Sequence, residues 1–239
     1  MIDLHCHILP GIDDGAKTFD ESLTILKNAA DAGVIAMALT PHYIKGSRYN
    51  ADNVQKSALL QQLRNLAANA GLSLQLYLGN ELFLDANLLP LIQSGQIASL
   101  NGSRYLLIEL PMRAELKNAT DLLFEIISAG FVPVIAHPER YEYFQNDLAK
   151  IQPFLDIGCL MQGDYQALRG RYGRSAQKAL KKFLERGQIH LLASDTHHST
   201  DDYQLQIAYD KIAKITKDST AAEHLFTETP LKILRNEPV

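Results

Sequence analysis

The chain has 239 residues, of which 46% are apolar and 21% charged, as in an ordinary globular protein that can bury one full core. Its formal net charge of −4 argues against general binding of nucleic acid, so an anionic substrate would have to be captured locally. No apolar run approaches the roughly 20 residues that cross a bilayer, which predicts no membrane insertion.

The first predicted strand lies in the segment Met1–Gly15 (MIDLHCHILPGIDDG) and ends in two histidines. Side chains two residues apart in an extended chain point the same way, so His5 and His7 would aim both imidazoles into one space. The Pro-Gly that follows bends the loop and returns the carboxylates of Asp13 and Asp14 over the strand end. A lone H-x-H pair is usually incidental, so its meaning depends on the rest of the chain.

Further strands and helices alternate along the whole chain. A capping box at Thr18–Glu21 begins the first helix, which ends near Gly33. Asn101-Gly102 lies between the apolar runs Ile97–Leu100 and Arg104–Leu110, which predicts a β-hairpin. The other predicted strands are Val34–Thr40, Leu74–Gly79, Val132–Ala136, Gly158–Gln162 and Ile189–Ala193, and the other predicted helices are Ala51–Ala70, Asn87–Gln93, Ala114–Ala129, Asp147–Leu155, Gly173–Arg186, Asp201–Lys217 and a short one from Thr229.

This alternation of about seven strand–helix units predicts an α/β fold with parallel strands and helical crossovers. The length of each unit favours a closed or nearly closed TIM-like barrel, with an open doubly wound sheet as the alternative. No linker divides the chain, so residues 1–239 form a single predicted domain. No glycine-rich phosphate-binding motif follows a strand, which argues against a nucleotide cofactor.

Residues of the types that bind metals follow nearly every predicted strand. In a barrel, the carboxyl ends of the strands converge on one face, where active sites are built. A single such residue would carry little weight, but their recurrence at strand ends indicates a shared site. The residues are His5, His7, His42, Glu81, Glu109, His137, Asp195 and His197.

The types of ligand narrow the choice of metal. Imidazoles and carboxylates without thiolates suit manganese, iron, zinc or cobalt, and differ from the all-oxygen shell of calcium. The candidates outnumber the ligands of one ion, so we expect two or three ions, with Glu81 as a bridge. Such clusters generate hydroxide near neutral pH and support in-line displacement at phosphorus. Cys6 lies between two strand-end histidines and would point the other way, as a small buried residue.

Arg140 follows His137 by three residues and is a candidate phosphate clamp, because a guanidinium directs two donors at a pair of phosphoryl oxygens. A surface salt bridge with Glu139 or Glu142 is the alternative. A second basic group is typical of a solvated helix face, with steering of an acidic substrate as its alternative. That group is Arg169, Arg171, Arg174, Lys178, Lys181 and Lys182.

The two cysteines, Cys6 and Cys159, predict a reducing compartment without a disulfide framework, hence the cytoplasm. We expect no signal peptide, because the first strand begins at residue 2. A cysteine phosphatase needs a reactive thiolate with an arginine six positions later, but those positions hold Ile12 and Tyr165. The predicted nucleophile is therefore metal-bound hydroxide, with no phosphoenzyme.

The motifs MIDLHCHILPGIDDGAK, TPHY, GNE, AHPERY and SDTHH, in this order, span essentially the whole chain. They resemble those of PHP-superfamily phosphatases of the CpsB/CapC type, which are manganese-dependent protein-tyrosine phosphatases acting on kinases that control capsule and exopolysaccharide synthesis. The resemblance implies a distorted (β/α)7 barrel with a trinuclear metal site. It implies phosphate binding for Arg140, an acidic position near the metals for Glu109, and ligand roles for His5, His7, Asp14, His42, Glu81, His137, Asp195 and His197.

The chain departs from this family after the last motif. An arginine in an xRPP-like segment is expected there, but the sequence reads HHSTDDYQLQ. A second phosphate-contacting arginine is therefore missing or comes from elsewhere, with Arg48, Arg113 and Arg169 as the candidates.

The leading hypothesis is a metal-dependent protein-tyrosine phosphatase whose substrate is the flexible, tyrosine-rich tail of a kinase. Asp195 or His197 would protonate the leaving tyrosinate, although their role as ligands takes precedence. One alternative is a small-molecule phosphomonoesterase such as a histidinol phosphatase. The other is a non-catalytic regulator that binds the kinase. The sequence leaves the oligomeric state open, a homo-oligomer included.

Overall fold

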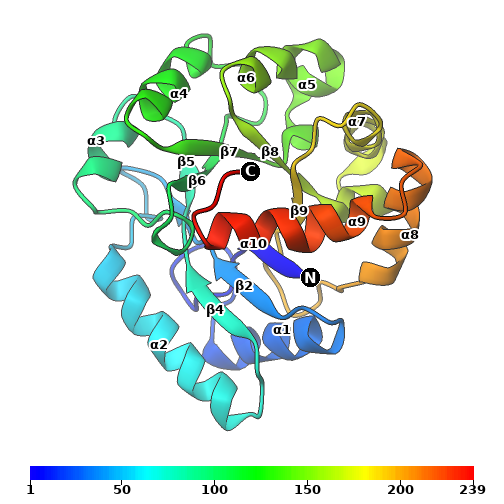
Figure 1. Cartoon of the computed structure of the whole chain (residues 1–239). Helices are drawn as coiled ribbons and strands as arrows, with labels where there is room; N and C mark the ends of the chain where they lie inside the picture. The colour runs from blue at the N-terminus through cyan, green and yellow to red at the C-terminus, as the bar shows by residue number, and fades with distance from the viewer.

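The computed structural model describes all residues from Met1 to Val239 (Figure 1). The strands are β1 (Ile2–Cys6), β2 (Ala36–Leu39), β3 (His42–Tyr43), β4 (Gln75–Leu78), β5 (Glu81–Phe83), β6 (Tyr105–Glu109), β7 (Val132–Ala136), β8 (Leu160–Asp164) and β9 (Leu191–Ala193). The helices are α1 (Phe19–Asp31), α2 (Asn53–Asn69), α3 (Leu88–Gln93), α4 (Ala119–Ser128), α5 (Glu142–Asn146), α6 (Gln152–Asp156), α7 (Gly173–Glu185), α8 (Leu205–Thr216), α9 (Ala221–Glu223) and α10 (Thr229–Leu234). Shorter helical segments are η1 (Leu100–Gly102), η2 (Pro138–Arg140), η3 (Leu148–Ile151), η4 (Tyr165–Arg169) and η5 (His224–Glu228).

All paired strands are parallel, as the alternation of strands and helices predicts, so the fold is mixed α/β. The strands form two sheets, in the orders β1-β2-β4 and β3-β5-β6-β7-β8-β9. The end of β1 also bonds to the segment after β9, because the Asp195 amide donates to the carbonyl of His5 at 3.0 Å and the His7 amide donates to Thr196 at 2.8 Å. The first and last strand ends of the chain therefore lie side by side.

The strands are covered on both faces, which explains why the central ones read as continuous apolar runs. One face packs against the surrounding helices in a core of 52 buried residues. The other face contributes to a second cluster of 13 buried residues, which includes Ile2 and Leu4 of β1 together with Ile233 and Leu234 of α10. Figure 1 shows α10 crossing beside the start of β1. The carboxyl ends of the strands are thus left for the polar residues.

The beginning of α1 agrees with the sequence prediction, whereas the beginning of α8 differs from it. The hydroxyl of Thr18 accepts a hydrogen bond from the Glu21 amide at 3.2 Å and caps α1. Helix α8 begins at Leu205 and not at the predicted Asp201. The Asp201 carboxylate accepts a hydrogen bond at 2.9 Å from the amide of His197, a residue before it in the sequence, and so does not cap a helix that follows. No helix of the fold has the length and apolar character that a bilayer crossing requires.

The predicted hairpin at Asn101-Gly102 is wrong. These residues belong to the 3₁₀ segment η1, where Asn101 has a φ of 54° and the Ser103 amide donates to the carbonyl of Leu100 at 3.0 Å. A hairpin partner has no place to bind, because both edges of β6 already pair in parallel, with β5 and with β7. Two other predicted helices also differ. The helix predicted at 147–155 is split into η3 and α6, and the helix predicted from Ala114 begins at Ala119 as α4.

Candidate metal centre

The predicted ligand residues lie together at or just after the carboxyl ends of strands, where His42 and Glu81 follow β2 and β4 and begin the short strands β3 and β5. Their nitrogen and oxygen atoms form three overlapping groups, and within each group the atoms lie within 4.8 Å of one another. His137 lies outside these groups, but its Nε2 is 2.9 Å from Oε1 of Glu81. The groups are His5, His7, Glu81 and Asp195; His7, Asp14, His42 and His197; and His42, Glu81 and Glu109.

The first group is fully buried and is built on the two histidines of the opening strand. Nε2 of His5 and Nε2 of His7 are 3.1 Å apart, so both rings do point into one space. Oε2 of Glu81 lies 3.3 Å from the His5 nitrogen and 3.2 Å from the His7 nitrogen. Oδ1 of Asp195 lies 3.1 and 3.3 Å from the same two atoms. Two imidazoles and two carboxylates thus converge on one point.

Two polar side chains fix the orientation of these histidine rings. Nδ1 of His5 is 2.7 Å from Oε1 of Gln162, and Nδ1 of His7 is 2.8 Å from Oδ2 of Asp13. When each Nδ1–H donates to these oxygens, the lone pair of each Nε2 is directed at the centre of the group. This is the usual way in which a protein holds a histidine that binds a metal.

The second group forms the outer side of the site. The ring of His197 stacks on that of His7 at 4.0 Å between centroids. Oδ1 of Asp14 lies 3.5 Å from Nε2 of His42 and 3.6 Å from Nε2 of His197. The side chain of Asp14 is 50% exposed, whereas Glu81 is 1% exposed. The site therefore has a buried inner part and an outer part that solvent reaches.

The titratable groups at the site shift one another's pKa values. Burial opposes the ionisation of Glu81, but His5 and His42 outweigh it and hold its pKa well below the ordinary value. Burial together with the charge of Glu81 raises the pKa of Glu109 to about 8. Burial favours the neutral form of His5, yet Glu81 and Asp195 raise its pKa to about 9. The carboxylates of Glu81 and Asp195 thus favour positive charge at the centre of the site.

Two buried atoms support the assignment of metal ligands. Nδ1 of His137 and Oδ1 of Asp195 are both buried and make no hydrogen bond, although the Asp195 oxygen lies 3.1 Å from Nε2 of His5. Such atoms cost free energy in an apolar interior unless another group satisfies them. The residues present are oxygen and imidazole donors, which fit manganese, iron, cobalt or zinc. The donor set is consistent with the metal site that the sequence predicts.

Arg140 reaches the same site from η2, directly after His137. Its guanidinium forms an ion pair with Asp195 and lies 4.5 Å above the ring centroid of Tyr172. The alternative of a surface salt bridge with Glu139 or Glu142 is wrong. Glu139 is buried and accepts a hydrogen bond from the amide of Asp164, while Arg113 lies 3.4 Å from Glu142. The side chain of Arg140 is 24% exposed, so it remains accessible.

The three candidates for a second phosphate-binding arginine differ in their surroundings. Arg169 is paired with Asp202, and Arg113 with Glu142. Arg48 instead lies over the ring of Tyr49 at 4.9 Å, and that ring stacks on His42 at 5.8 Å. Arg48 is thus linked through one aromatic ring to the candidate ligands.

Sequence reasoning missed several residues that support the site. Gln162 is the last residue of the predicted strand Gly158–Gln162, which was the available signal, and it lies in the middle of the observed strand β8. Asp13 was noted only as a carboxylate of the returning loop. Its Oδ2 contacts the ring of His7 and also accepts from the backbone amide of His42 at 3.1 Å. Tyr172 gave no signal, because it meets Arg140 only in the folded chain.

Cys6 lies away from the candidate ligands, as predicted. It is fully buried and its thiol donates to the carbonyl of Ala38 at 3.3 Å. Burial and nearby carboxylates such as Asp3 raise its pKa well above the ordinary value. A thiol of this kind is a poor nucleophile.

Gly15 allows the loop that carries Asp13 and Asp14 to return over β1. A Cβ at this position would lie 1.8 Å from the carbonyl oxygen of His7, so the backbone would have to move. We expect Gly15→Ala to lower the melting temperature by about 10 °C and to reduce bound metal. The comparison variant is Gly33→Ala, where a Cβ meets nothing within 4 Å but the φ of 88° costs about 1 kcal/mol, so we expect a smaller loss of stability and no loss of metal. Thermal unfolding and metal analysis check this, and equal behaviour of the two variants would contradict it.

Comparison with known proteins gives a consistent result. The family model described as "Capsular polysaccharide synthesis, CpsB/CapC" matches residues 1–235. The tyrosine-protein phosphatase CpsB of Streptococcus pneumoniae is 33% identical over 99% of each chain, and the putative tyrosine-protein phosphatase CapC of Staphylococcus aureus is 33% identical over 84% of this chain and 78% of its own. A crystal structure from work on YwqE of Bacillus subtilis and CpsB of S. pneumoniae, described as unique metal-dependent tyrosine phosphatases, superposes with a TM-score of 0.94. It is 28% identical in sequence and covers 100% of this chain and 96% of that one. The chain belongs to the CpsB/CapC family.

Proposed function

We propose that this protein is a metal-dependent protein-tyrosine phosphatase, a phosphoric monoester hydrolase whose substrate is a tyrosine-phosphorylated kinase of capsule or exopolysaccharide synthesis. The observation that carries the proposal is the convergence of three overlapping ligand groups beside an accessible arginine. The names of its relatives, which are tyrosine-protein phosphatases and metal-dependent, support the same activity.

The proposed ligands would hold two or three ions, with manganese as the expected metal and iron, cobalt or zinc as alternatives. Glu81 belongs to two of the groups and is the proposed bridge. When bound, the ions would supply hydroxide from water near neutral pH and polarise the phosphoryl oxygens. The ligands are His5, His7, Asp14, His42, Glu81, Glu109, His137, Asp195 and His197.

The residues around the ions bind and orient the substrate. Arg140 directs its donors at the phosphoryl oxygens and offsets charge that grows in the transition state. Asp195 and the ring of Tyr172 hold its guanidinium in place. Arg48 is the proposed second contact to the phosphate.

Proton transfer to the leaving tyrosinate would fall to Asp195 or His197. Burial opposes ionisation of Asp195, but His5 and Arg140 contribute to a pKa well below its ordinary value. A carboxylate held in this form is a poor acid, which favours its role as a ligand and as the partner of Arg140. His197 is 20% exposed, but its Nδ1 lies 2.9 Å from the carbonyl oxygen of Asp195, so its Nε2 can either hold an ion or carry the proton, and the ligand role takes precedence.

We propose one domain over residues 1–239 and closure of the two sheets into a distorted (β/α)7 barrel. The backbone bonds from His7 and Asp195 across the ends of β1 and β9 support closure. A cytoplasmic location is consistent with two free, buried cysteines. The proposed partner is the flexible tail of the substrate kinase, which could reach the exposed outer side of the site.

Hydrolysis of a phosphotyrosine peptide by purified protein tests the proposal. We expect turnover with manganese, complete loss with excess chelator, and no effect of a thiol-alkylating reagent, because Cys6 and Cys159 are buried. Histidinol phosphate serves as the comparison substrate. Its exclusive hydrolysis would change the substrate assignment, and hydrolysis of neither compound by metal-loaded protein would overturn the catalytic proposal.

A further inference from the structure

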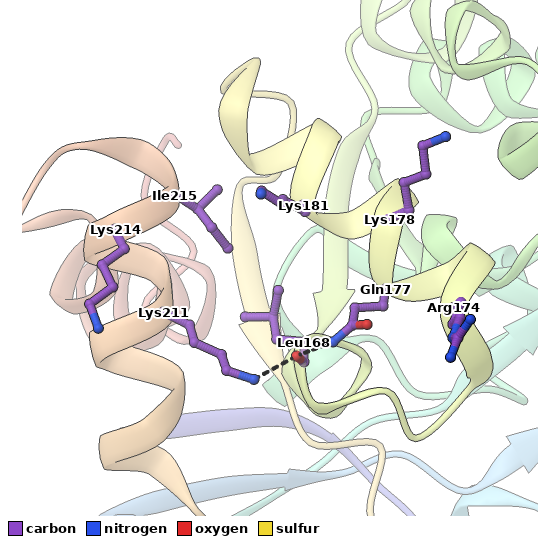
Figure 2. A pocket seen from close by; sticks show the side chains of 8 residues that line it. All are labelled: Leu168, Arg174, Gln177, Lys178, Lys181, Lys211, Lys214 and Ile215. Carbon is purple, nitrogen blue, oxygen red and sulfur yellow. Dashed lines mark hydrogen bonds between the residues drawn. The ribbon is translucent and has the colours of Figure 1, made fainter.

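A basic cleft lies between helices α7 and α8, outside the candidate metal centre. It encloses about 450 Å³, and five cationic side chains line it: Arg174, Lys178 and Lys181 from α7, and Lys211 and Lys214 from α8. Figure 2 shows these side chains on two helices, with Leu168 between the helices and Lys211 hydrogen-bonded to its carbonyl. No acidic side chain lines the cleft. This is a concentration of positive charge on a chain whose net charge is −4.

Little of this charge is neutralised within the protein. Lys181 is the only one of these five side chains with a carboxylate within 4.0 Å, at 3.9 Å from Glu185. Lys211 donates to the carbonyl of Leu168 at 2.9 Å, a contact that leaves its charge in place. Arg174 and Lys178 are four residues apart on one helix face, where like charges repel. An anion in the cleft would relieve this repulsion.

The cleft begins near the rim of the metal centre. Tyr172, whose ring supports Arg140, precedes Arg174 by two residues. From Arg174 to Lys181 the helix rises about 10 Å, at about 1.5 Å per residue. An extended peptide covers this distance with about three residues. The cations are thus spread over more length than one phosphate group can contact.

We propose that the α7–α8 cleft binds an anionic stretch of the same polypeptide that presents phosphotyrosine to the metal centre. The stretch would carry acidic residues or further phosphate groups, because both are negatively charged and complement the cations of the cleft. The aliphatic side chains of Leu168 and Ile215 in the lining suit a polypeptide. The inference rests on the proposed function and adds a second contact region for its substrate.

The test compares three phosphotyrosine peptides that differ only in the flanking residues, which are neutral, acidic or phosphorylated on a second tyrosine. The variant is Lys178→Gln with Lys214→Gln, because neither lysine forms an ion pair or hydrogen bond within the protein, so the fold should be unaffected. The control is Lys27→Gln with Lys232→Gln, which removes the same charge elsewhere. Peptide binding is measured by fluorescence anisotropy, and turnover is measured separately.

For the cleft variant we expect about a tenfold rise in Kd and KM for the two anionic peptides, an unchanged kcat, and wild-type values for the neutral peptide. The difference should shrink at high salt. A response to the doubly phosphorylated peptide alone would identify phosphate as the recognised group. Equal Kd values for the cleft and control variants would overturn the inference, as would tight binding of an oligonucleotide with no preference among the peptides. Absence of turnover in every protein would refute the proposed function, while the Kd values would still decide the role of the cleft.

Discussion

Glu81→Gln is expected to lower kcat for a phosphotyrosine peptide by about 10³-fold and to reduce the bound metal. The carboxylate is 1% exposed and its oxygens lie within 3.3 Å of nitrogens of His5, His7 and His42. Glutamine keeps the volume but removes the negative charge, so it leaves the imidazoles without their common anionic partner. Because Glu81 belongs to two ligand groups, its loss should affect more than one ion.

The measurement combines steady-state kinetics with elemental analysis of the purified variant. Glu125→Gln makes the same chemical change at an exposed position of α4 and serves as the control. We expect the control to retain wild-type kinetics and metal content. A Glu81→Gln protein with full metal content and normal kcat would show that this carboxylate is not a ligand, and the bridging assignment would be wrong.

The strand ends were the part of the site that the sequence could predict. Parallel strands read as buried apolar runs, and polar residues after such runs must converge at one edge. His5, His7 and Glu81 meet for this reason, although they are far apart in the sequence. Two other site residues have unusual backbones, with φ of 34° at His137 and 47° at Asp195. Backbone strain of this kind depends on the surrounding fold, so no local sequence pattern predicts it.

The remaining features depend on contacts that only the folded chain creates. The prediction of a hairpin at Asn101-Gly102 was wrong because the turn sequence does not show whether both edges of the following strand are already paired. The cations of α7 form a run in the sequence, whereas the lysines that α8 contributes, such as Lys211, belong to a later helix and are separate from that run. Only the packing of the two helices makes one cleft of them.

Arg140→Ala is expected to lower kcat/KM by about 10²- to 10³-fold, because the guanidinium offsets charge that develops on the phosphoryl oxygens. Arg140→Lys should recover about tenfold of this loss, since it keeps the charge but not the paired donors. Arg113→Ala is the matched control, because Arg113 is 87% exposed and pairs only with Glu142. Steady-state kinetics with phosphotyrosine peptides check all three variants.

The division of the effect between kcat and KM identifies what Arg140 does. An interaction that forms only in the transition state lowers kcat, whereas one that also binds the ground state raises KM. Metal content must be measured as well, because Arg140 also pairs with Asp195, a proposed ligand. Loss of metal in Arg140→Ala would mean that the arginine acts by positioning Asp195. Full metal content with a reduced kcat would show that Arg140 acts on the phosphoryl group. Wild-type kinetics would show that Arg140 has no role in the reaction.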